Sequence, residues 1–152
     1  TMREWKEQGR FRYIGVTTSN DRQYEQMETV LEENDLDFVQ VDYSLGNRNA
    51  NDRLLPLAQD RGIAVLVNLP FGRGRLFNAV GDRPLPDWAA DIDATSWAQV
   101  FLKYVMSHPT GAIPIPGTTK PHHAADNLNA ARGRLPDATL RAEMEAFIDP
   151  LL

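Results

Sequence analysis

The sequence contains no cysteine, which excludes disulfide bonds, thiolate catalysis and cysteine-based zinc sites. Histidine is scarce as well, and the spacing of His108, His122 and His123 does not place two of them on one helical face around a metal ion. A P-loop, a Gly-x-Ser-x-Gly elbow and a Rossmann glycine motif after a strand are also missing. We therefore expect no metal site. The sequence also contains none of the familiar motifs that would identify a catalytic residue.

Long apolar runs and an excess of positive charge are absent too. No apolar run approaches the roughly 20 residues of a membrane-spanning helix, and no signal-peptide pattern precedes the first expected strand. The 16 lysines and arginines are scattered among 21 aspartates and glutamates, which gives a net charge of −5. We expect no nucleic-acid partner, no membrane association and a cytoplasmic location, with an export signal upstream as the alternative.

Apolar segments with strand character alternate with helical patterns along the chain. The expected strands cover residues 11–16, 38–43, 63–67 and 112–115. The expected helices are one from Asn20 or Asp21 to Glu33, one over 52–61, one that Thr95 or Ser96 caps, one over 121–131 and one over 137–147. Residues 1–8 have the pattern of the last turns of another helix, which Gly9 ends.

This alternation predicts an α/β fold with one parallel sheet and right-handed crossovers. The aliphatic run 63–67 is typical of a parallel strand buried on both faces. Residues 70–95 lose periodicity, so we expect a long functional loop with at most a short turn at 88–92. Hydrophobic residues make up 42% of the sequence, enough for a single domain over 1–152, and four β/α units are half of a TIM (β/α)8 barrel.

The last expected strand ends in a turn that has the features of a phosphate site. Gly117 gives the turn conformational freedom, and Pro121 suits the first turn of the helix that follows. Thr118, Thr119 and Lys120 therefore stand beside a helix N-terminus, whose unpaired N–H groups and dipole favour a bound anion.

Five parts of the chain resemble, in the same order, the second half of the aldo/keto reductase family. They are 12–17 (RYIGVT), 38–45 (FVQVDYSL), 54–58 with 61–65 (LLPLA and RGIAV), 70–74 (PFGRG) and 113–127 (IPIPGTTKPHHAADN). The family is a (β/α)8 barrel of roughly 300 residues, which is within the range of TIM barrels. The resemblance implies the second, four-stranded half of such a barrel, which carries the NADP (NADPH) site.

At the nicotinamide end, the resemblance assigns four positions. Thr17 and Thr18 stand where the family has Ser and Asn that bind the nicotinamide carboxamide, and Thr17 keeps the hydroxyl. Gln40 matches the family glutamine, whose amide both donates to and accepts from that group, and a glutamine bonded to a loop is the alternative. Asn68 stands where many members place a tyrosine that stacks on the ring, so Phe71 is the other candidate for an aromatic face.

At the phosphate and adenosine end, the implied contacts come from two segments. The segment with Pro70, Phe71, Gly72 and Gly74 resembles the loop whose amides hold the pyrophosphate. The implied 2′-phosphate and adenine contacts are Gly117, Thr118, Thr119, Lys120, His123, Asp126 and Asn127. His123 replaces a common arginine and cannot make its bidentate fork. The alternative for both His122 and His123 is a surface position on the first turn of the helix.

The family's catalytic tyrosine, lysine, aspartate and histidine belong to the first four β/α units, and none of them can be assigned here. The resemblance therefore implies a half that binds the cofactor, inactive by itself, of a protein that reduces a small-molecule carbonyl compound. The alternative is a self-associating half-barrel, a nucleotide-binding or structural module without catalysis. An open four-stranded sheet leaves its edge strands unpaired, and two copies could close a ring as a homo-oligomer.

Overall fold

The computed structural model describes all of residues 1–152 and contains one four-stranded parallel sheet. The strands are β1 (Gly15–Thr17), β2 (Phe38–Asp42), β3 (Ala64–Asn68) and β4 (Ile113–Pro114), in the spatial order β1-β2-β3-β4. All three neighbouring pairs are parallel, which confirms the predicted α/β class built from parallel β/α units.

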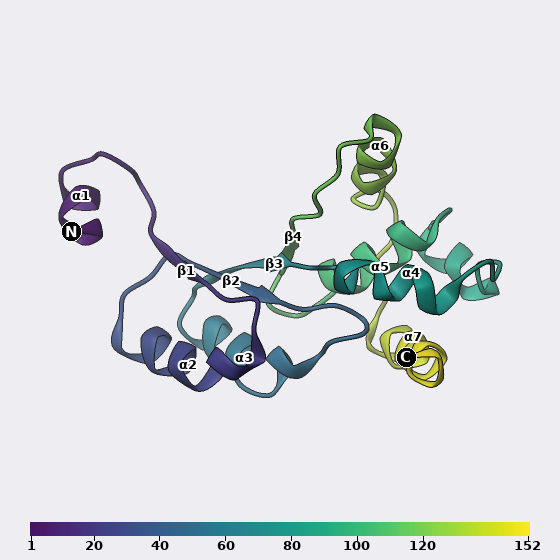
Figure 1. Cartoon of the computed structure of the whole chain (residues 1–152), viewed down its shortest axis with the longest axis horizontal. Coiled ribbons are helices and arrows are strands. Elements are labelled where there is room, and N and C mark those ends of the chain that lie inside the picture. The colour runs from purple at the N-terminus through teal and green to yellow at the C-terminus, as the bar shows by residue number, and fades with distance from the viewer.

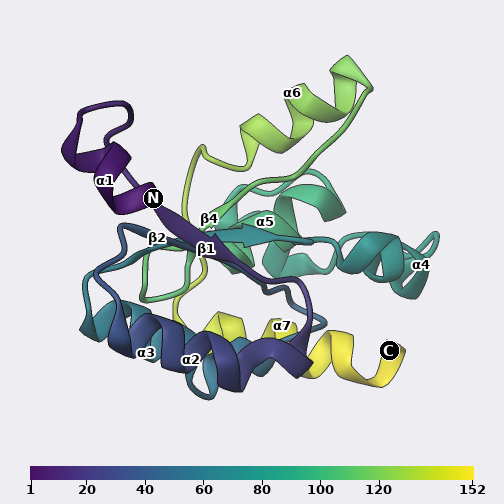
Figure 2. The ribbon, with the colours of Figure 1, turned by 60° about the vertical axis from the view of Figure 1, so that its left-hand side comes forward.

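Seven α-helices accompany the sheet: α1 (Met2–Glu7), α2 (Tyr24–Glu33), α3 (Leu54–Asp60), α4 (Arg75–Val80), α5 (Trp97–Met106), α6 (Pro121–Asn129) and α7 (Ala138–Ile148). Helices α2 and α3 lie side by side below the sheet with α7 on the same side, and α6 lies on the other side (Figures 1 and 2). None of these helices combines the length and the apolar character that a membrane span requires.

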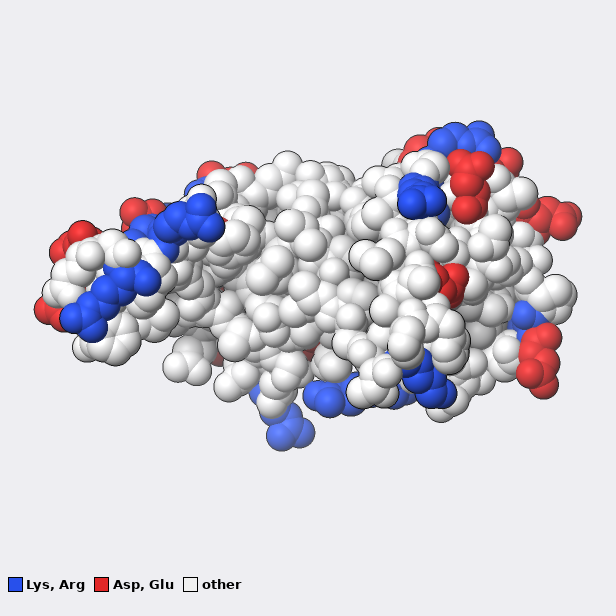
Figure 3. Space-filling view, turned by 90° about the horizontal axis from the view of Figure 1, so that it is seen from above, with Lys and Arg blue, Asp and Glu red and all other residues white.

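Side chains on the strands alternate between two different environments. Val39, Val41, Val65 and Val67 are buried in the core, whereas the residues between them are only half-buried. The opposite face, seen from above in Figure 3, has a broad uncharged middle, and charged residues gather toward its ends and margin. Burial of 63–67 on both faces was therefore a wrong expectation, because no layer of this chain covers the second face of β3.

Two boundaries of strands differ from the predicted ones. Strand β1 begins at Gly15 instead of at residue 11, and Asp37 and Phe38 of the neighbouring segment both donate their N–H groups to Ile14 O. The last strand contains only Ile113 and Pro114, although Ile115 N still donates to Val67 O at 2.9 Å. Proline has no N–H group to extend a ladder, which explains how short β4 is.

The segment 70–95 contains more regular secondary structure than predicted. It contains α4, with Leu76 and Val80 buried one turn apart, and 3₁₀ turns at 72–74 and 87–92, the second of which agrees with the expected turn at 88–92. Other local signals are confirmed. Asn20, Ser96 and Asp137 accept N-capping hydrogen bonds from Arg22 N, Gln99 N and Leu140 N, and Pro121 is the first residue of α6.

Candidate functional site

Three of the proposed nicotinamide-contacting residues lie on one face at the carboxyl ends of neighbouring strands. In the parallel register Thr17 pairs with Gln40, and Asn68 pairs with Asp42, two residues beyond Gln40. Thr17 is exposed, while Gln40 and Asn68 are half-buried. The alternation of burial along β2 and β3 places the Gln40 and Asn68 side chains on the face opposite the buried valines. Ligands of β/α folds bind at the carboxyl ends of parallel strands, where these residues lie.

The Thr18 hydroxyl bonds within the chain instead of pointing toward a ligand. Its side chain is buried, and its Oγ1 donates to Gln23 Oε1 at 2.8 Å and accepts from Asn20 N at 3.2 Å. Its carbonyl oxygen instead accepts from Asn68 Nδ2 at 3.0 Å, across the intervening strand β2. The Asn68 amide therefore bridges β3 and β1. Its Oδ1 is buried with no donor, which leaves an acceptor at the strand ends.

The loop from Pro70 to Gly74 has an unusual backbone. Gly72, Arg73 and Gly74 have φ angles of +56°, +55° and +88°. Gly72 N donates to Leu69 O and Gly74 N to Phe71 O, so these two amides bond inside the turn. The Phe71 ring packs against Phe77 and Phe101, with centroids 5.0 and 6.5 Å apart, so it lies within an aromatic cluster beside α5.

A groove between α5 and α6 collects five of the seven residues predicted for the adenosine end, all but Thr119 and Lys120, together with Phe71. Its volume is about 420 Å³, and we call it the α5–α6 groove. The predicted residues that line it are Phe71, Gly117, Thr118, His123, Asp126 and Asn127. Phe77, Ser96, Trp97 and Ala98 complete the lining, and no motif in the sequence marked these four as groove residues. Trp97 stacks on Phe101 and Phe147 and also lines the groove.

Asp126 connects the two helices that border the groove. Its carboxylate accepts from Ser96 Oγ at 2.7 Å and from Gln99 Nε2 at 2.6 Å, and Ser96 in turn caps α5. The side chains of His123 and Asn127 make no hydrogen bond inside the chain. Asp126 therefore sets the width of the groove, and its two neighbours on α6 are free to contact a ligand.

Lys120 and Thr119 lie exposed at the start of α6. Lys120 occupies the N-cap position, its N–H donates to Thr118 Oγ1 at 3.2 Å, and its ammonium group forms no ion pair within the chain. Helix α6 has nine residues, so its N-terminal N–H groups and dipole add to this cation. The start of α6, next to Thr118 of the groove, is therefore suited to a phosphate group.

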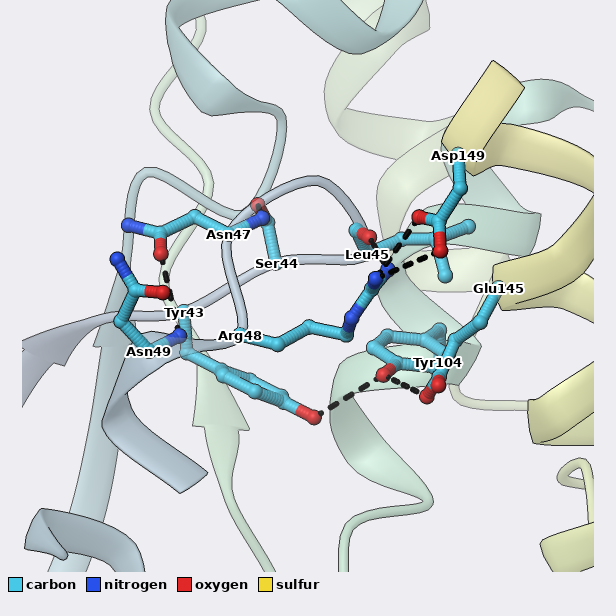
Figure 4. A network of polar contacts seen from close by, with 9 residues as sticks. All are labelled: Tyr43, Ser44, Leu45, Asn47, Arg48, Asn49, Tyr104, Glu145 and Asp149. Carbon is cyan, nitrogen blue, oxygen red and sulfur yellow. Dashed lines mark hydrogen bonds and ion pairs between the residues drawn. The ribbon is translucent and has the colours of Figure 1, made fainter. Parts of the chain in front are cut away.

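A polar network away from the strand ends fixes the C-terminal helix. In Figure 4, Tyr43 points to Tyr104, which bonds Glu145 of α7, and Arg48 reaches Asp149. Arg141 adds a hydrogen bond to Tyr43 at 2.9 Å and lies over the Tyr104 ring at 4.1 Å. Burial raises the pKa of the Tyr104 hydroxyl far above its ordinary value. Tyr43 and Tyr104 are therefore structural.

A family model for the aldo/keto reductases matches residues 1–146 of the chain. The chain belongs to the aldo/keto reductase family. The oxidoreductase YcsN of Bacillus subtilis is 29% identical over 134 residues, which is 84% of this chain and 44% of that protein. The NADH-specific methylglyoxal reductase of Escherichia coli is 28% identical, over 97% of this chain and 53% of the relative.

Solved aldo/keto reductases share the fold of the chain. The Klebsiella pneumoniae aldo/keto reductase in complex with NADP and acetate superimposes with a TM-score of 0.75 at 24% identity, over 97% of this chain and 52% of that one. The thermostable aldo-keto reductase Tm1743 gives a TM-score of 0.69 over 99% of this chain and 52% of its own. The chain spans about half the length of the relatives it matches, and its four strands are half of their TIM barrel.

Proposed function

We propose that this chain is the cofactor-binding half of an NADPH-dependent aldo/keto reductase that reduces a small-molecule carbonyl compound. The observation that carries the proposal is the α5–α6 groove, where six predicted residues from distant parts of the chain meet. In such a protein the bound NADPH supplies a hydride to the carbonyl carbon. The residues of this chain bind and orient the cofactor, in a protein for which we propose a cytoplasmic location.

At the nicotinamide end, the amides of Gln40 and Asn68 are the groups that fit the carboxamide. Gln40 can donate to and accept from it, and the unpaired Asn68 Oδ1 can accept from its NH₂ group. A buried acceptor without a donor costs roughly 1–3 kcal/mol, which a bound donor would recover. Since the Thr18 hydroxyl is engaged by Gln23, the amide of Asn68 takes the place of the asparagine that the family carries at position 18.

At the adenosine end, a cation stands at the start of α6, and aromatic surfaces line the groove beside it. Lys120 and the hydroxyls of Thr118 and Thr119 stand at the α6 N-terminus, where they fit a 2′-phosphate. Trp97 and Phe77 offer apolar surface for the adenine ring. His123 also lines the groove, where its ring can offer a hydrogen bond but cannot make the bidentate fork of an arginine. We therefore expect preference for NADPH over NADH to depend on Lys120.

The experiment compares the two cofactors on a matched pair of variants. Trp97 lines the groove, so its fluorescence reports NADPH and NADH binding by direct titration. We expect Lys120→Ala to weaken NADPH about tenfold, the equivalent of about 1.4 kcal/mol for one charge-assisted contact, and to leave NADH unchanged. Arg61→Ala, an exposed cation at the end of α3, is the control and should change neither affinity. Equal losses for both cofactors, or no saturable binding of NADPH, would contradict the proposal.

Turnover distinguishes this role from that of a complete enzyme. Because no tetrad residue can be assigned, we expect the chain by itself to oxidise NADPH with methylglyoxal no faster than buffer does. A rate clearly above the buffer control would mean that the chain contains its own catalytic group.

A second candidate is a half-barrel that associates with a second copy. The uncovered sheet face favours it, with Tyr13, Ile113 and Ile115 exposed by 58, 51 and 42%, and both β1 and β4 have one unpaired edge. Joining β4 of one copy to β1 of the other would continue a parallel order, as an eight-stranded ring requires. Light scattering that reports a dimer supports this candidate, and a monodisperse monomer rules it out.

A further inference from the structure

Helix α6, which forms one wall of the α5–α6 groove, has little apolar contact with the rest of the molecule. None of its residues is buried, and its one large aliphatic side chain, Leu128, is 74% exposed. Figure 2 shows the helix extending away from the sheet, and α5 is its neighbour. Burial of an apolar face is what ordinarily fixes a helix in a protein. Polar contacts therefore do most of the work of holding α6 in place.

The middle of α6 is fastened by a single side chain. The bonds from Ser96 Oγ and Gln99 Nε2 to the Asp126 carboxylate are the only side-chain hydrogen bonds between residues 121–129 and the rest of the chain. No ion pair involves this helix. Both donors belong to fixed parts of α5, because Ser96 caps that helix and Gln99 is buried. We call this contact the Asp126 latch.

The turn at residues 130–134, which follows α6, is held more firmly. The buried Lys103 ammonium group donates to the carbonyl oxygens of Arg132 and Arg134, the second at 2.9 Å. Asp93 Oδ2 in turn accepts from Arg134 N at 3.0 Å. Hydrogen bonds in which one partner is charged are stronger than those between neutral groups. The C-terminal end of α6 is therefore its fixed end.

The segment before α6 has few restraints. Ile115 N bonds Val67 O as the last contact of the sheet with this segment, and no hydrogen bond joins residues 116–119 to the sheet or to α5. A Cβ added to Gly117 would meet nothing within 4 Å. A segment with so few contacts can change its direction at little cost. Once the Asp126 latch is broken, α6 can therefore rotate about the turn that follows it.

We propose that α6 is a hinged wall of the α5–α6 groove, which opens when the Asp126 latch breaks and closes again on the bound ligand. The turn at 130–134 is the pivot. Rotation about it carries His123, Asp126 and Asn127 away from α5 and widens the groove. The ligand is the adenosine end of the cofactor, so the role of the hinge in binding rests on the proposed function. The hinge itself does not.

Relaxation dispersion in NMR tests the hinge in the free chain, without any cofactor. We expect exchange between two states on the microsecond-to-millisecond timescale at the amides of 121–129 and at the side-chain NH₂ group of Gln99, with flat profiles at 130–134. The open state should be the minor one, with roughly 0.1–10% of the molecules. Flat profiles along α6 would overturn the proposal.

A pair of variants assigns this exchange to the latch. Asp126→Ala removes both hydrogen bonds, so its α6 amides should take the chemical shifts that the dispersion data give for the minor state of the unsubstituted chain. Asp91→Ala, which removes an exposed carboxylate, should leave the profiles unchanged. A melting curve checks that each variant is folded. Shifts in Asp126→Ala that do not match the minor state would overturn the proposal.

Stopped-flow titration with NADPH tests the role of the hinge in binding, with Trp97 fluorescence as the signal. If α6 opens first, the observed rate at high NADPH concentration levels off at the opening rate that relaxation dispersion gives. In Asp126→Ala this limit should be at least tenfold higher. Asp126→Asn keeps an acceptor for one donor and should lie between the two, and Asp91→Ala should match the unsubstituted chain.

The outcomes separate the hinge from the cofactor site. A rate that rises linearly with NADPH concentration and is the same in Asp126→Ala would overturn the hinge and leave the proposed function standing. Absence of NADPH binding would contradict the proposed function, and the dispersion experiment would still decide whether α6 opens.

Discussion

Removal of the Asp126 carboxylate should open the α5–α6 groove and lower the stability of the protein. The carboxylate accepts one hydrogen bond from Ser96 Oγ and one from Gln99 Nε2, and the Gln99 side chain is buried. In Asp126→Ala both donors lose their acceptor. The Gln99 NH₂ group then has no partner in a place that water reaches poorly, while its Oε1 keeps the bonds to Thr95.

The expected magnitude follows from these two bonds. A hydrogen bond to a charged group contributes roughly 1.5–3 kcal/mol, and the lower end applies here because Asp126 is only half-buried. We expect Asp126→Ala to lower the free energy of unfolding by about 2–3 kcal/mol, or the melting temperature by roughly 5–10 °C for a domain of this size. Asp126→Asn keeps an acceptor for one donor, so we expect about half of that loss.

Urea denaturation at pH 7 measures the free energy of unfolding of both variants and of Asp91→Ala, an exposed carboxylate chosen as the control. A second readout is NADPH affinity, which should fall in Asp126→Ala because the groove loses the contact between its walls. A loss below about 0.5 kcal/mol, the range of ordinary surface substitutions, would refute the role of Asp126 as the link between α5 and α6.

Three further predictions concern stability. Lys103→Met removes a buried ammonium group that donates to two carbonyls of the turn after α6, so calorimetry should show a loss of about 2 kcal/mol. Burial lowers the pKa of His108 from 6.5 to about 4, so the unfolded chain binds more protons between these values and stability should fall as pH drops from about 6.5 to 4. His108→Gln should flatten that dependence, and an unchanged profile in pH-dependent urea titrations would contradict the assignment. Gly133→Ala should cost about 1–3 kcal/mol in thermal melts, since Gly133 has a φ of +74° and a Cβ there would stand 2.7 Å from Asp93 Oδ2. A melting temperature equal to that of the unsubstituted chain would contradict this prediction, because it would show that the turn adapts to the added Cβ.

Much of the fold could be predicted because its signals are local. Ser96 and Asp137 stand just before apolar periodic segments and cap their helices as expected. The strand at 63–67 was recognised from its aliphatic run, with a shift of one residue. Helix α4 was missed because glycines and prolines around it hide a periodic pair, Leu76 and Val80, that is only one turn long.

The sequence could predict where the site residues lie, but it could not predict which side chains they contact. The sequence placed Thr18 at a strand end and could not show that its hydroxyl bonds Gln23. It placed Asp126 on a helix beside the expected cofactor and could not show that Ser96, thirty residues away, is its partner. Contacts between side chains far apart in sequence arise only when the chain is folded.

The most direct test of the account is the mapping of NADPH on the chain by amide chemical shifts in NMR. The account predicts shifts that concentrate at the ends of β1, β2 and β3 and along the α5–α6 groove, with Thr118 to Lys120 among the largest. It also predicts that NADH reproduces the shifts at the strand ends and loses those at Lys120. Shifts confined to other surfaces, or no saturable change with NADPH, would contradict the assignment of this half-barrel as the part that holds the cofactor.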